Sequence, residues 1–149
     1  MGRNTTTGRV LELQVLPALE RGGYTYSEQE KIGMKVNGRK HVIDILITKL
    51  QDADERILVS LKWQQTGGTA EQKVPFEIIN LMHACNEYGF EKAYLILGGT
   101  DHEAGLSQTG WTLRKWYLER GLAEYINYEK SIKILLPDQF IALANSGKL

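Results

Sequence analysis

One acid and one lysine lie on two neighbouring strand-like stretches between His41 and Gln64. Asp44 is inside an apolar run, and Lys62 comes at the end of the next run. Strand side chains alternate faces with a period of two residues, so an antiparallel pairing can place Asp44 beside Lys62. A carboxylate among apolar residues is costly unless it meets a cation or a metal ion. An acid beside a lysine at the end of a sheet is the minimum apparatus for metal-assisted phosphodiester cleavage.

The elements that would position these two residues can be traced from periodicity and turn signals. Asn37-Gly38 is a strong hairpin signal because both residues tolerate positive φ, and the next turn falls at Asp52–Glu55. Apolar residues on both faces of the strand that carries Asp44 indicate a sheet covered by helices on both sides. The expected order is a helix capped by one of Thr5, Thr6 or Thr7 and ending at Arg21, strands at 31–36, 39–48 and 56–64, a long helix to Tyr88, a strand at 92–97, a helix at 111–120, a strand at 132–136 and a helix at 138–145.

This order, with an acid in the second strand and a lysine two residues past a small residue in the third, resembles the PD-(D/E)XK nuclease superfamily. The resemblance covers residues 9–97. It implies an α/β, restriction-endonuclease-like α-β-β-β-α-β core, with a mixed central sheet flanked by helices, in a single domain over 1–149. It also implies that Asp44 binds a metal ion, and that Lys62 activates the attacking water and stabilises charge on the phosphate. The alternatives are a structural ion pair for Asp44 and a lysine that extends from a buried strand into solvent.

Ser60 departs from the family pattern, which has Glu or Asp two residues before the lysine. A hydroxyl is a poor substitute for an anionic ligand to Mg²⁺. The site is therefore inactive, works with fewer carboxylates, or takes its second acid from elsewhere. Some restriction enzymes of this fold with a small residue at this position take that acid from the next helix.

Three glutamates are candidates for the second acid. Glu12 lies on the first helix, where members of the superfamily often place a glutamate that reaches the metal, and Glu77 and Glu71 lie on the long helix. Each can instead be a solvated helix residue, which the helix dipole favours near an N-terminus. Gln64, on the same strand face as Lys62, is a candidate for binding a metal-bound water or a phosphate, or for capping the strand end.

Rival chemistries lack their motifs. His41, His83 and His102 show no zinc-binding spacing, and the single cysteine, Cys85, cannot supply a thiolate cluster. The glycine-rich phosphate loops of nucleotide-binding proteins do not occur in the sequence.

The formal net charge is zero, from 18 basic and 18 acidic residues, which argues weakly against a nucleic-acid partner. The distribution of charge is more informative, because the segment from Lys31 to Ile43 has four cations and no acid. We expect this protruding hairpin to contact DNA phosphates or a groove. A second cluster near Arg114 is expected to be the polar face of an ordinary amphipathic helix. The residues predicted to bind DNA are Lys31, Lys35, Asn37, Arg39, Lys40 and His41.

Together these features predict a Mg²⁺-dependent or Mn²⁺-dependent endonuclease that acts on double-stranded DNA. One chain offers one active site, so cutting both strands predicts a homodimer or a higher homo-oligomer. By resemblance, the products carry 5′-phosphate and 3′-hydroxyl ends. The alternative is a non-cleaving nucleic-acid-binding or assembly module that keeps the fold. We expect a cytoplasmic protein that does not enter membranes. The sequence has a single cysteine, Cys85, and it shows no signal peptide and no apolar run of ~18 residues.

Overall fold

The computed structural model describes residues 9–49, 55–64, 70–102, 110–128 and 131–149. Its centre is a five-stranded mixed sheet with the strand order β1-β2-β3-β4-β5. The β1–β2 and β2–β3 pairs are antiparallel, and the β3–β4 and β4–β5 pairs are parallel. The strands are β1 (Thr25–Met34), β2 (Lys40–Lys49), β3 (Ile57–Gln64), β4 (Lys92–Gly99) and β5 (Ile132–Leu135).

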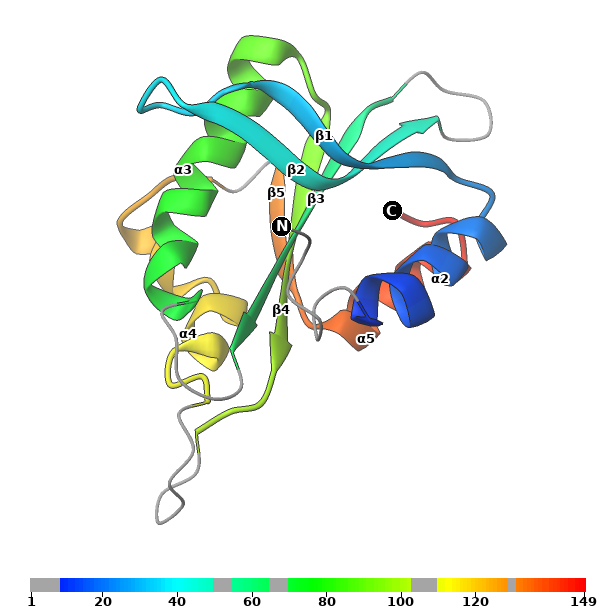
Figure 1. The fold of residues 1–149 in the computed structure, drawn as a ribbon. Helices are drawn as coiled ribbons and strands as arrows, with labels where there is room; N and C mark the ends of the chain where they lie inside the picture. The colour runs from blue at the N-terminus through cyan, green and yellow to red at the C-terminus, as the bar shows by residue number, and fades with distance from the viewer. Residues whose placement is uncertain (1–8, 50–54, 65–69, 103–109, 129–130) are drawn as a thin grey trace.

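Helices cover both faces of this sheet, as Figure 1 shows, with α3 and α4 on one side and α2 and α5 on the other. This arrangement confirms the predicted α/β class with a mixed sheet between helical layers. The helical elements are η1 (Leu11–Val15), α2 (Leu16–Arg21), α3 (Ala70–Tyr88), α4 (Arg114–Leu118), η2 (Gly121–Glu124) and α5 (Pro137–Asn145).

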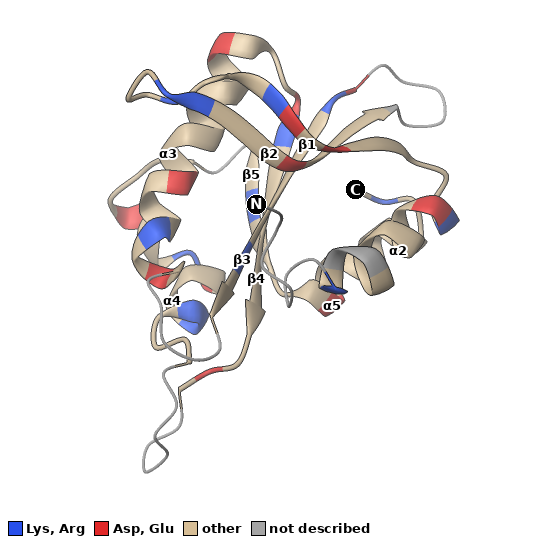
Figure 2. Cartoon of the chain, in the orientation of Figure 1, with Lys and Arg blue, Asp and Glu red and all other residues tan. Residues whose placement is uncertain are grey.

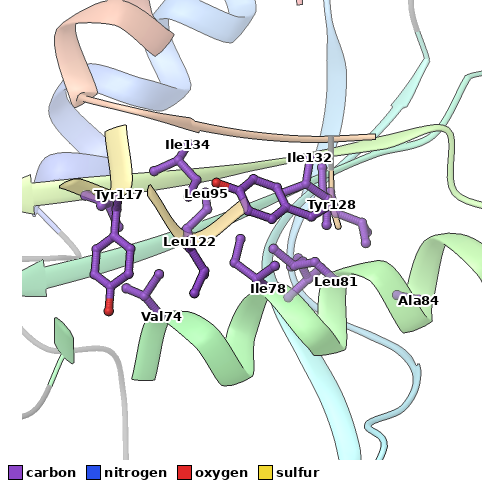
Figure 3. Packing of buried hydrophobic residues seen from close by; sticks show 14 of the residues in the cluster. Val74, Ile78, Leu81, Ala84, Leu95, Tyr117, Leu122, Tyr128, Ile132 and Ile134 are labelled. Atoms are coloured by element: carbon purple, nitrogen blue, oxygen red, sulfur yellow. The ribbon is translucent and has the colours of Figure 1, made fainter. Parts of the chain in front are cut away.

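The long helix α3 packs on the sheet through a stripe of apolar residues (Figure 3). Val74, Ile78 and Leu81 are fully buried, and their spacing puts them on one face of the helix. They meet Leu95 on β4 and Ile132 on β5 in one cluster. Burying an aliphatic side chain contributes about 1.5–3 kcal/mol, so this stripe fixes the rotation of α3 about its axis.

Strand β1 is longer than predicted, beginning at Thr25 rather than at Lys31. Its early residues are polar because β1 is at the sheet edge and exposed, so they show no apolar alternation. The hairpin after β1 also differs from a two-residue turn. Lys35 and Arg39 pair through a 2.7 Å backbone hydrogen bond, and Gly38 takes φ +83° in a three-residue loop.

The first helix is interrupted, as Pro17 leads one to expect. Proline has no N–H to donate to the preceding turn, and the residues before it, Leu11–Val15, form a π-helical stretch that leads into α2. The helix predicted over 111–120 is shortened at both ends to α4, and the left-handed conformation of Arg120 prevents its continuation past the C-terminal end. The predicted cap at residues 5–7 and most of the turn at 52–55 lie outside the described residues.

Gly99 provides a test of the β3–β4 ladder. Its φ is +102°, and a Cβ there would lie 2.2 Å from the carbonyl oxygen of Gln64, its ladder partner. Gly38 has φ +83° with open space around its Cβ position. Gly38→Ala should cost about 1–2 kcal/mol of unfolding free energy, for the left-handed conformation alone. Gly99→Ala should cost on the order of 3 kcal/mol or more, because backbone must also move. Equal losses in denaturant titrations would contradict this packing.

Candidate functional site

Asp44 lies where β2 and β3 part. The ladder between these strands pairs Ile45–Ile47 with Ile57–Val59, and Asp44 is the next residue on β2. Its Oδ2 accepts a hydrogen bond of 2.7 Å from the backbone N–H of Leu61 on β3. A side-chain carboxylate therefore bridges the two strands at the end of their ladder.

Burial raises the pKa of the Asp44 carboxyl above its ordinary value. The Leu61 N–H and the charge of Lys62 act in the opposite direction, and they do not outweigh burial. The charge of Glu77 adds to the rise. An ionised Asp44 is thus under-compensated by the protein alone, which is the electrostatic setting that an added cation relieves.

Gln29 on β1 is a contact of Asp44 that the sequence did not indicate. The β1–β2 register, which pairs Glu28 with Ile45 and Glu30 with Ile43, puts Gln29 across from Asp44. Its Nε2 donates to Asp44 Oδ1 at 3.3 Å. Gln29 has φ +51°, a left-handed conformation that non-glycine residues seldom adopt. The sequence did not indicate Gln29 because it lies in the polar first half of β1, before the predicted start of the strand at Lys31.

Glu77 on α3 reaches the position at which the third strand has Ser60. The Ser60 hydroxyl donates a short hydrogen bond to Glu77 Oε2, and Lys62 Nζ is 3.6 Å from the same oxygen. His41 Nε2 is 3.9 Å from the other carboxylate oxygen. The side chain of Glu77 is 11% exposed and that of Lys62 is 26% exposed. A helix residue thereby places a carboxylate against the strand residue that lacks one.

Glu77 is held in its ionised form. Burial alone would raise the pKa of Glu77, but Lys62, the Ser60 hydroxyl and His41 together lower it below the ordinary value. Asp44 and Glu77 therefore have pKa values shifted in opposite directions, although their charges act on each other. The difference arises because Glu77 has a cationic partner in direct contact and Asp44 depends on a backbone N–H.

A second glutamate of α3, Glu71, is hydrogen-bonded elsewhere, which argues against its candidacy as the second acid. Glu71 Oε1 accepts the backbone N–H groups of Thr112 at 2.7 Å and Leu113 at 2.9 Å. These contacts hold the residues that lead into α4, and hydrogen bonding outweighs burial to lower the pKa of Glu71. Six residues separate Glu71 from Glu77, which turns the two side chains to different sides of the helix.

The side chains of Gln64 and His41 are buried, although both were predicted to bind ligands. Gln64 is buried, and its Oε1 accepts the N–H of Ala70 at 2.9 Å, at the start of α3. Its binding of a water or a phosphate stays a prediction. His41 is 2% exposed and faces Glu77, so its assignment to the DNA-contacting hairpin is corrected. The side chain of Glu12 lies outside the described residues, and its metal role stays a prediction.

Basic residues mark the β1–β2 hairpin, as the blue bands of Figure 2 show. Lys31, Arg39 and Lys40 are exposed, and Lys35 is half-buried. Asn37 is also exposed, and its Oδ1 accepts the N–H of Arg39 at 3.0 Å. The hairpin is anchored to α3 by a hydrogen bond of 3.0 Å from the Val36 N–H to Asn80. DNA contact by these side chains stays a prediction.

The described carboxylates define a small donor set. Among the residues that the structure describes, His, Cys, Asp and Glu side chains do not gather in threes suited to a metal ion. Asp44 and Glu77 remain as the acids at this end of β3. Mg²⁺ is commonly bound by one or two carboxylates and keeps several waters, so these hard oxygen donors fit it.

Comparison with known proteins identifies the family of this chain. The family model of the PD-(D/E)XK nuclease superfamily domain matches residues 3–148. The chain therefore belongs to the PD-(D/E)XK nuclease superfamily, whose nucleases typically use divalent metal ions. This confirms the resemblance that the order of strands and the residues Asp44 and Lys62 indicated.

The remaining comparisons are sparse. The crystal structure of a protein of unknown function, AF1548, is similar at 16% identity and a TM-score of 0.44. The match covers 82% of this chain and 54% of AF1548, so this chain spans about half the length of AF1548. Among curated proteins, none matches the sequence. Within the described residues, no helix has the length and apolar character needed to cross a membrane.

The pKa values of Asp44 and Glu77 are shifted in opposite directions, so neutralising each residue should have opposite effects on stability when a chelator keeps metal ions away. A raised pKa means that stability falls as the pH rises through the folded-state pKa of Asp44. Asp44→Asn should therefore raise the melting temperature at pH 7.

A lowered pKa means that Glu77 contributes stability above its unfolded-state pKa, and this stability is lost as the pH falls. Glu77→Gln should cost about 1–3 kcal/mol at pH 7, since it weakens charge-assisted hydrogen bonds. Shifts of the same sign would refute this electrostatic description.

Proposed function

We propose that the protein is a Mg²⁺-dependent DNA endonuclease that hydrolyses phosphodiester bonds in double-stranded DNA. The observation that carries the proposal is the contact of the Ser60 hydroxyl with the Glu77 carboxylate, beside Lys62. This contact supplies from α3 the acid that β3 lacks. The reason for favouring a non-cleaving module was the serine at position 60, and Glu77 beside it weakens that reason.

The donor set supports a hard divalent cation. Asp44 and Glu77 would hold Mg²⁺, since both present carboxylate oxygens and Asp44 lacks full compensation. When bound, the ion supplies Lewis-acid polarisation of the phosphate and lowers the pKa of a coordinated water. Membership in the superfamily supports divalent-metal chemistry in general, and the choice of Mg²⁺ or Mn²⁺ is part of the proposal.

The chain's own residues would do the rest of the work. Lys62 is partly exposed at the strand end, where its ammonium group can orient the attacking water and stabilise charge developing on the phosphate. His41 is buried beside Glu77, and burial lowers the pKa of its imidazole. Its Nε2 is 3.9 Å from the Glu77 carboxylate, where the imidazole would help to position that side chain.

The basic hairpin would position the duplex. Its exposed cations Lys31, Arg39 and Lys40 project from the same two strands that carry Gln29 and Asp44. Phosphate contacts fix orientation on DNA without reading sequence. Because each chain offers one such site, double-strand cleavage would require two copies related by a two-fold axis.

Replacing Lys62 should separate chemistry from binding. Lys62→Ala is expected to lower the rate of Mg²⁺-dependent cleavage by about 10²-fold or more, because the lysine acts on the transition state. Its affinity for the same DNA in Ca²⁺ should stay within about threefold of the wild type. Lys73→Ala, which removes an exposed lysine of α3, is the matched control and should cleave normally. Cleavage by Lys62→Ala at the wild-type rate would overturn the assignment.

Removing the hairpin charges should change the salt dependence of binding. Replacing Lys35, Arg39 and Lys40 by alanine should reduce the slope of log affinity against log salt by roughly one unit per lost phosphate contact. A control protein loses the same charge elsewhere, through alanine at Lys92, Lys133 and Lys148. An unchanged slope in the hairpin variant, measured by fluorescence anisotropy, would place the DNA on another surface.

A further inference from the structure

A hollow opens beside the end of β3 that carries Lys62, and it is lined by Trp63, whose side chain leaves the opposite face of the strand. It has a volume of about 340 Å³ and is lined by Trp63, Gln14, Arg114, Pro137 and Asp138, among others. Ligand pockets are commonly ~300–1,000 Å³, so this one is at the small end of the range. A volume of this size can hold a single flat ring system.

Trp63 forms one wall of this pocket. Its ladder partner on β4 is Gly98, and a Cβ on Gly98 would lie 2.5 Å from the indole ring. The ring therefore lies against bare backbone, which only glycine permits. The indole is half-buried, so part of it remains accessible. A tryptophan seated in this way is a firm platform for stacking an aromatic ligand.

The charges around the pocket favour a neutral ligand over a phosphate. Arg114 is already committed, because its Nε is 3.0 Å from Asp101 Oδ1 and its Nη1 donates to the carbonyl oxygens of Leu97 and Gly99. Asp138 adds a second carboxylate to the lining. An anion in the pocket would meet the Asp138 carboxylate and a guanidinium whose charge is already offset by Asp101. The amide of Gln14 offers a donor and an acceptor, which suits the edge of a heteroaromatic ring.

The location of the pocket relates it to the proposed reaction. Trp63 directly follows Lys62, so their Cα atoms are about 3.8 Å apart and their side chains leave opposite faces of the strand. A nucleic-acid strand that crosses this sheet end can place a phosphate on the Lys62 side and a neighbouring base on the Trp63 side.

We propose that the Trp63 pocket binds an unpaired nucleobase next to the phosphodiester to be cleaved. The inference rests on the proposed nuclease function and narrows its substrate class. A base inside a duplex must be extruded before it can enter such a pocket, which costs a few kcal/mol. The enzyme should therefore prefer DNA that already carries an unpaired nucleotide, as in flaps, bulges and branched ends.

The test compares two fluorescein-labelled ten-residue strands in chelator, oligothymidylate and an abasic strand with the same phosphates. Base–aromatic stacking is worth about tenfold per base, so the wild type should bind oligothymidylate about tenfold more tightly than the abasic strand. Trp63→Phe should keep most of this preference, and Trp63→Leu should abolish it while binding the abasic strand as the wild type does. Trp116→Leu, which removes a partly exposed tryptophan outside the pocket lining, should leave the preference unchanged.

Two outcomes would overturn the proposal. One is equal binding of both strands by the wild type. The other is a loss in Trp63→Leu that is the same for both strands, which would mean that Trp63 acts on the fold or on phosphate contacts. Neither outcome bears on cleavage, because the assay contains no metal ion, and the Lys62→Ala experiment decides that question separately.

Discussion

The hydrogen bond between Ser60 and Glu77 is the interaction on which the site depends. It joins a strand of the central sheet to the helix layer, and it brings a carboxylate to a strand that would otherwise present only a hydroxyl. Lys62 then neutralises part of the buried charge at 3.6 Å. A partly buried anion without these partners would be costly. The packing of Ile78 and Leu81 against the sheet keeps the helix at the rotation that makes the contact.

The two carboxylates have different electrostatic roles in the protein without metal. Glu77 is satisfied by a hydroxyl and a lysine, whereas Asp44 has a backbone N–H and a weak contact from Gln29. The pKa of Asp44 therefore stays above its ordinary value, and in the proposed function a bound cation would lower it. Asp44 follows the last paired residue of the β2–β3 ladder, and there its carboxylate accepts the backbone N–H of Leu61.

Asp44 and Lys62 could be predicted from the sequence, because both lie in strands with a clear apolar pattern. Glu77 could be named only as one of three acids, because the partner of a helix residue depends on helix rotation, which tertiary packing decides. Gln29 was missed because an exposed edge strand shows little apolar alternation. His41 was misplaced because its neighbours in sequence are exposed hairpin residues, while its own side chain turns inward to α3.

The central claim is that Glu77, and not Glu71, completes the metal-binding carboxylates. Its most direct test is a titration of Mn²⁺ into the protein, followed by electron paramagnetic resonance of the free ion. Glu77→Gln should weaken Mn²⁺ binding by about tenfold or more, whereas Glu71→Gln should leave the affinity within about twofold of the wild type. Unchanged affinity in Glu77→Gln, or equal losses in both variants, would contradict the account.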